Sequence, residues 1–92
     1  MNAQRRKDIK AAADKMQQAR DLLAEAKETL EVARNEEQEA YDNMPEGLQV
    51  SERGYQMEEN SNNLTETLDE IDEWCDGIDE YIEKLDTEII NA

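Results

Sequence analysis

Histidine and phenylalanine are absent from this chain, and cysteine occurs once. Without histidine, the chain can form no Ser-His-Asp triad, no ordinary catalytic zinc site and no Glu-x-x-His pair of a di-iron bundle. A single cysteine, Cys75, cannot form an internal disulfide. The three glycines are isolated at Gly47, Gly54 and Gly77, so no phosphate-binding glycine loop is present. We therefore expect no enzyme, no catalytic residue, no bound metal and no cofactor.

Aromatic residues and long apolar runs are also scarce. Only 4% of the 92 residues are aromatic, which argues against a thick globular core. No apolar run approaches the roughly 20 residues that span a bilayer, and no secretory signal is evident, so we expect a cytoplasmic protein. Charged residues make up 38% of the chain, a composition typical of coiled coils and long helices.

Basic residues are few compared with acidic ones. The chain holds 10 Lys and Arg against 25 Asp and Glu, which gives a net charge of −15. Phosphates would be repelled, which argues against direct binding to nucleic acid or to an anionic membrane. The charge favours a protein partner with a basic surface.

The first half of the chain carries a heptad pattern in steps of three and four residues. One position of the repeat holds mostly large side chains: Ile9, Met16, Leu23, Leu30, Glu37 and Met44. The other holds alanine each time: Ala12, Ala19, Ala26, Ala33 and Ala40. The pattern predicts a helix over about 4–43, with an alanine-rich seam against which a second helix packs closely.

The same rhythm returns in the second half with bulkier residues. The seam positions are Met57, Ser61, Leu64, Leu68, Ile71, Cys75, Ile78, Ile82, Leu85 and Ile89. This pattern predicts a second helix over about 51–90, with Cys75 buried and unreactive. Poor helix formers surround Ser61, so we expect the helix to kink or restart there.

Residues 44–50 separate the two helices. Pro45 disfavours helix at the preceding residue, and Gly47 could supply a positive φ. Ser51 is a suitable N-cap for the second helix, although Gly54 stands where a capping box would need Glu or Gln. The sequence therefore predicts that residues 1–92 form one all-α domain. We expect an antiparallel two-helix coiled-coil hairpin, with dimerisation into a four-helix bundle as a further option.

Charge supports this pairing of the helices. Residues 1–20 hold six basic and two acidic side chains, whereas residues 66–88 hold eleven acidic side chains and only Lys84 of opposite sign. A hairpin lays these segments side by side, although each exposed ion pair contributes only about 0–1 kcal/mol.

The second helix carries an unusual surface of one charge, because residues 54–83 contain no Lys or Arg. Its candidate partner-binding carboxylates lie off the seam: Asp69, Asp72, Glu73, Asp76, Asp79, Glu80, Glu83 and Asp86. On a helix they form columns spaced by about 5.4 Å, similar to phosphates along a nucleic-acid strand. They could occupy a basic groove of another protein, or they could solvate the helix and pair with the basic end of the first one.

Trp74 and Tyr81 lie seven residues apart, one step off the seam of the second helix. They could widen the core stripe, inside a homodimeric four-helix bundle, or anchor another protein.

The segment YDNMPEGLQVSERGYQMEE, residues 41–59, resembles part of small uncharacterised bacterial and phage helical-hairpin proteins. In these, a Tyr-Asp-Asn-Leu/Met-Pro-Glu-Gly/Asn-Leu-Gln-x-Ser-Glu-Arg motif joins two long helices. The resemblance implies the hairpin and carries no activity. In size and charge the chain is also similar, as a class, to phage inhibitors of host nucleases, including anti-CRISPR proteins. That likeness implies a phage-encoded protein that acts in the host cytosol.

These observations favour a non-catalytic acidic protein, an inhibitor that covers a basic surface of a host nucleic-acid-binding or defence protein. The alternative is a structural or assembly protein that forms a homodimeric helical bundle. A third hypothesis is a regulatory subunit that contacts its partner through the loop from Asn43 to Arg53.

Overall fold

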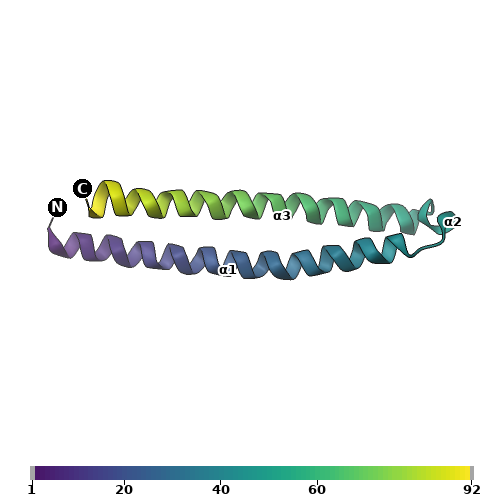
Figure 1. The fold of residues 1–92 in the computed structure, drawn as a ribbon, viewed down its shortest axis with the longest axis horizontal. Helices are drawn as coiled ribbons and strands as arrows, with labels where there is room; N and C mark the ends of the chain where they lie inside the picture. Colours follow the sequence, from purple (N-terminus) through teal and green to yellow (C-terminus); the bar gives the residue numbers. More distant parts are fainter. Residues whose placement is uncertain (1, 92) are drawn as a thin grey trace. The chain divides into compact units, whose positions relative to one another are not determined.

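The computed structural model describes residues 2–91, and among these it shows an all-α helical hairpin without strands (Figure 1). The elements are α1 (Ala3–Asp42), the short α2 (Glu46–Gln49), α3 (Glu52–Lys84) and the π-helix η1 (Leu85–Ile90). The predicted helix ends agree with these bounds to within one residue, except that the last turns form a π-helix. Contacts divide the chain into two compact units.

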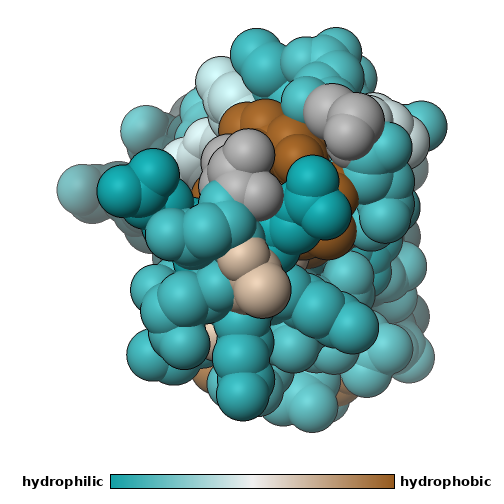
Figure 2. Space-filling view, turned by 90° about the vertical axis from the view of Figure 1, so that its left-hand side faces the viewer, coloured by the Kyte–Doolittle hydropathy of each residue, from teal (hydrophilic) through white to brown (hydrophobic). Residues whose placement is uncertain are grey.

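Unit 1 contains the described residues up to Glu25 and those from Asp72 onward. Here the first part of α1 lies antiparallel to the last part of α3 and to η1 (Figure 1). Its buried apolar side chains are Ala13 and Cys75, which are 9% and 6% exposed. Figure 2 looks onto the end of this unit, where hydrophilic residues cover most of the surface and a small hydrophobic area shows between them. The core of unit 1 is therefore thin.

Unit 2, residues Ala26–Ile71, contains the rest of α1, α2 and the start of α3. Its core is formed by Leu68 and Ile71, each 4% exposed. Ser61 is equally buried, and its hydroxyl donates a hydrogen bond to Gln38 Oε1 on α1 at 2.8 Å. This bond satisfies the polar group that interrupts the apolar seam.

The expected restart of the helix at Ser61 is wrong, because α3 runs through this residue without a break. A serine weakens a helix when its hydroxyl competes for nearby backbone groups. Here the hydroxyl of Ser61 bonds across to α1 instead. The cross-helix contact therefore overrides the weak helix propensity of the segment.

The seam of α3 is confirmed, since each of its ten predicted positions is buried or half-buried. The alanine seam of α1 is wrong: all five alanines of that register are exposed. The half-buried or buried positions that recur every seven residues are instead Ala13, Arg20, Lys27, Arg34 and Tyr41, and Ala24 is half-buried as well. The two registers share their large residues and differ by one residue at the intervening position. Long side chains at that position can lay their aliphatic stems over α3, and they bury more apolar surface than alanine would.

The first helix ends at Asp42, shortly before Met44, the residue whose helical conformation Pro45 disfavours. Pro45 then precedes α2, where its carbonyl accepts bonds from Leu48 N and Gln49 N at 2.8 and 3.1 Å. The expected positive φ at Gly47 is wrong, because no described glycine has a positive φ. The chain reverses through this short helical turn, so it needs no left-handed residue.

The start of α3 confirms the N-cap. Gly54 N–H donates a hydrogen bond to Ser51 Oγ at 3.3 Å, which satisfies a free donor of the first turn. Gly54 is buried, and a side chain there would place its Cβ 2.6 Å from Gln49 C and from Leu48 O. The glycine that breaks the capping box is therefore required by the close approach of the α2 backbone.

The π-helix η1 has no counterpart in the predictions. Asn91 N–H bonds to Asp86 O at 2.9 Å, five residues back, and Asn91 Nδ2 donates to Asp86 Oδ1 at the same distance. The wider turn leaves both Ile89 and Ile90 half-buried, although the heptad pattern assigns only Ile89 to the seam.

Candidate protein-binding surface

All eight predicted carboxylates are exposed. Asp69 lies in unit 2. The other seven lie in unit 1, and we call them the acidic surface: Asp72, Glu73, Asp76, Asp79, Glu80, Glu83 and Asp86. These residues follow one another at spacings of one or three along α3 and the start of η1, so the helix holds them as a dense array of negative charge.

Part of the acidic surface borders a shallow groove of about 360 Å³ between α1 and the C-terminal part of the chain. The α1 side contributes Lys10, Asp14 and Gln17, and the facing side contributes Asp79, Glu83 and Asp86. Ala13, Ile82 and Ile90 supply its apolar lining. Charged side chains from both segments therefore line this groove, which we call the charged groove.

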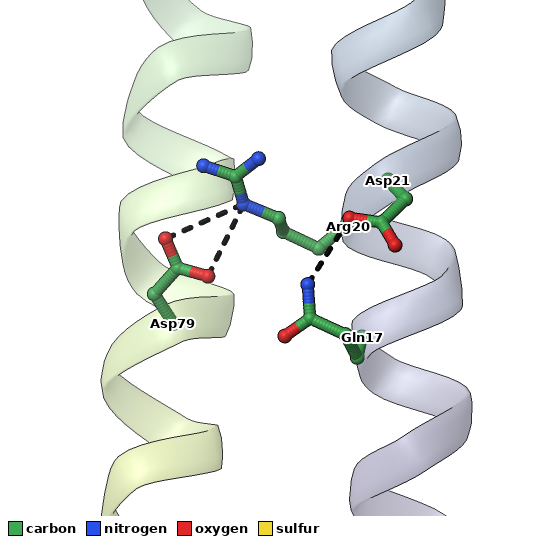
Figure 3. A network of polar contacts seen from close by, with 4 residues as sticks. All are labelled: Gln17, Arg20, Asp21 and Asp79. Carbon is green, nitrogen blue, oxygen red and sulfur yellow. Dashed lines mark hydrogen bonds and ion pairs between the residues drawn. The ribbon is translucent and has the colours of Figure 1, made fainter.

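Arg20 on α1 reaches across to α3 and forms an ion pair with Asp79 (Figure 3). Its Nε lies 3.2 Å from Asp79 Oδ1 and 3.3 Å from Oδ2, and the two side chains are 32% and 46% exposed. The hydrogen bond to Asp79, and then the charge of that carboxylate, raise the pKa of Arg20 above its usual value. Gln17 and Asp21 pair along α1 beside it, with 3.1 Å between Gln17 Nε2 and Asp21 Oδ1. Asp79 thus serves the pairing of the two helices as well as the acidic surface.

Trp74 and Tyr81 also remain on the surface, where they are 56% and 63% exposed. They line a second groove, about 430 Å³ in volume, with Leu23, Glu73, Gly77 and Ile78. We call these six residues the aromatic groove. Its residues differ entirely from those that line the charged groove, because Trp74 and Tyr81 flank the seam of α3 on one side and Asp79 and Asp86 flank it on the other.

The exposed alanines of α1 in unit 1 continue the aromatic groove. Ala19 lies one turn before Leu23, and Ala12 lies one turn before Met16, on the side of α1 away from Lys10 and Gln17. Leu22, which is 65% exposed, lies next to this strip. One side of unit 1 therefore combines small alanines on α1 with large aromatic side chains on α3.

Sequence reasoning missed the contact made by Arg20. Assigning the seam to Ala19 placed Arg20 outside it, although Arg20, Lys27 and Arg34 recur every seven residues. That basic periodicity, opposite a strongly acidic helix, was the available signal.

Metal and membrane sites are not evident in the part of the chain that the structure describes. Residues 2–91 contain no group of three or more Cys, Asp or Glu placed to hold a metal ion. None of their helices combines the length and the apolar character needed to cross a membrane. Cys75 is a free, buried thiol, as its seam position predicts.

Comparison with known proteins adds no family: no family model matches the chain, and neither a curated protein nor a solved structure is similar to it.

Proposed function

We propose that this chain is a non-catalytic binding protein whose acidic surface covers a basic surface of a protein partner. One observation carries the proposal. The seven carboxylates of the acidic surface are all exposed on one side of the chain's C-terminal half, and no Lys or Arg interrupts residues 54–83. An ordinary solvated helix face mixes both signs, and a one-signed face creates a field that attracts basic partners.

The spacing of the carboxylates suggests the class of partner. Residues one turn apart on α3 repeat every ~5.4 Å, which is similar to the spacing of phosphates that a basic nucleic-acid groove accepts. Binding would release counterions from both surfaces, so it would weaken steeply as salt rises. We therefore propose a nucleic-acid-binding or defence protein as the partner. The likeness in size and charge to phage inhibitors of host nucleases supports a phage-encoded inhibitor that acts by stoichiometric occlusion.

Capture of the partner from the lysate of the native host at low and high salt tests this proposal. The test variant combines Asp76→Asn, Glu80→Gln and Glu83→Gln, which remove three exposed charges from the acidic surface. We expect it to lose capture, and we expect double-stranded DNA or RNA to displace the captured partner from the unmodified chain.

A matched control combines Glu28→Gln, Glu31→Gln and Glu39→Gln, which remove the same charge from exposed positions of α1. Capture should survive these changes. Retention of the same partner at both salt concentrations, or equal loss of capture in both triple variants, would contradict the proposal.

A further inference from the structure

Unit 1 exposes several large apolar side chains, although few of its apolar residues are buried. Ala13 and Cys75 are its buried apolar residues, whereas Leu22, Trp74 and Tyr81 are each more than half exposed. No described side chain of large volume is fully buried. Chains with so little core usually gain stability by association, because two helices alone bury only one stripe each.

We propose that the aromatic groove and the alanines beside it form the interface with a second copy of this chain. The two copies are related by a two-fold axis that runs parallel to the helices. In this arrangement α1 of each copy lies on α3 of the other, which gives a four-helix bundle in which every neighbouring pair is antiparallel.

The arrangement matches small residues with large ones. Within one copy, the pair of Arg20 and Asp79 shows which positions on α1 and α3 lie at the same height. By that register Tyr81 lies level with Gln18, about 1.5 Å along the axis from Ala19, so in the dimer the Tyr81 ring of each copy lies against Ala19 of the other. The exposed alanines, which do not form the seam of the hairpin, gain a role as the surface that accepts the aromatic rings.

The shape of this side identifies the occupant as a second copy. On α1 it presents the small, exposed residues Ala12 and Ala19, and on α3 it presents the large, exposed side chains of Trp74 and Tyr81. The two-fold axis places the alanines of each copy against the aromatic side chains of the other, so the surface is complementary to itself. The other two-fold arrangement, with α1 on α1, would set alanines against alanines and aromatic side chains against aromatic side chains.

The aromatic groove shares only Glu73 with the acidic surface of the proposed function. Asp79 and Asp86 lie on the opposite side of the α3 seam from the aromatic groove, and they stay exposed in the dimer. The dimer can therefore fail while the acidic surface still binds a partner, and the reverse also holds.

Sedimentation equilibrium of the full chain over a range of concentrations tests the inference. We expect a dimer at micromolar concentration. Ala19→Glu places a charge against the ring of Tyr81 in the second copy, and it should raise the dissociation constant by roughly a hundredfold. The control is Ala11→Glu, which adds the same charge to an exposed alanine of α1 on the side away from α3. It should leave the dimer intact.

Fluorescence of Trp74, the only tryptophan, gives a second measurement. Its emission should shift to shorter wavelength when the dimer forms, and the shift should be lost in Ala19→Glu, while circular dichroism shows the helices retained. A monomeric unmodified chain at tens of micromolar would overturn the inference. So would a dimer that Ala19→Glu leaves as tight as before, or one whose Trp74 emission equals that of the monomer.

Discussion

Replacing Gly54 by alanine gives the sharpest test of how the chain turns into α3. Gly54 is buried in the first turn of this helix, and its missing side chain leaves room for the backbone of Leu48 and Gln49. An added Cβ would lie 2.6 Å from Gln49 C and from Leu48 O, well inside the usual contact distance. Both neighbours are backbone atoms, so no change of rotamer can relieve the overlap.

The magnitude follows from two opposing terms. Inserting a methyl group into closely packed backbone costs about 1–3 kcal/mol. The lower conformational entropy of alanine in the unfolded chain returns about 0.5–1 kcal/mol. Because the added Cβ overlaps backbone atoms that cannot move independently, the cost should lie at the upper end of its range, and we expect Gly54→Ala to lower the free energy of unfolding by about 2 kcal/mol. For a chain of this size, each kcal/mol corresponds to a fall in Tm of about 4–8 °C.

Gly47→Ala is the matched control, because a Cβ at Gly47 meets no atom within 4 Å and its φ is not positive. It should raise the free energy of unfolding by about 0.5–1 kcal/mol. Urea unfolding followed by circular dichroism measures both variants, at one protein concentration because association shifts apparent stability. If Gly54→Ala proved as stable as the unmodified chain, the account of the close contact between α2 and α3 would be refuted.

Three further predictions concern the seam. Ala13→Gln buries an amide and should lower the free energy of unfolding by about 1–3 kcal/mol, whereas Ala33→Gln, at an exposed alanine, should change it by no more than about 0.5 kcal/mol. Equal losses of stability would contradict the register in which Ala13, and not the exposed alanines, faces α3. Leu68→Ala should lower the free energy of unfolding by about 2–5 kcal/mol in the same urea assay, since this side chain is 4% exposed, and a loss under 1 kcal/mol would contradict its core position. Burial, and then the hydrogen bond to Glu58 Oε2 at 3.2 Å, raise the pKa of Tyr41 above its usual value of 10.0. The stabilisation from the neutral Tyr41 side chain is therefore complete below the pKa of the unfolded chain, and it is lost as pH rises through the higher pKa of the folded chain. Absorbance titration against Tyr41→Phe should show tyrosinate forming above the usual pH, and Glu58→Gln should lower the pKa only in part; an unshifted Tyr41 would contradict the contact.

The candidate surface was predictable in part. All ten residues assigned to partner binding from their spacing off the seam are exposed, because a heptad fixes which positions of α3 point away from its partner. Spacing alone did not separate them into two groups. The contacts made by Arg20 and Leu23 show that Asp79 and Asp86 border one groove, whereas Trp74 and Tyr81 border another.

The sequence by itself determined the two helices, their ends, the proline-limited turn, the Ser51 cap and the seam of α3. These are local properties, set by periodicity and by the allowed φ and ψ angles of a few residues. The register of α1 was decided only by tertiary structure. Ala12 and Ala13 both fit a heptad that contains Ile9 and Met16, and only the contact with α3 selects between them. The need for glycine at 54 likewise arises from the backbone of another segment, which no pattern within α3 can reveal.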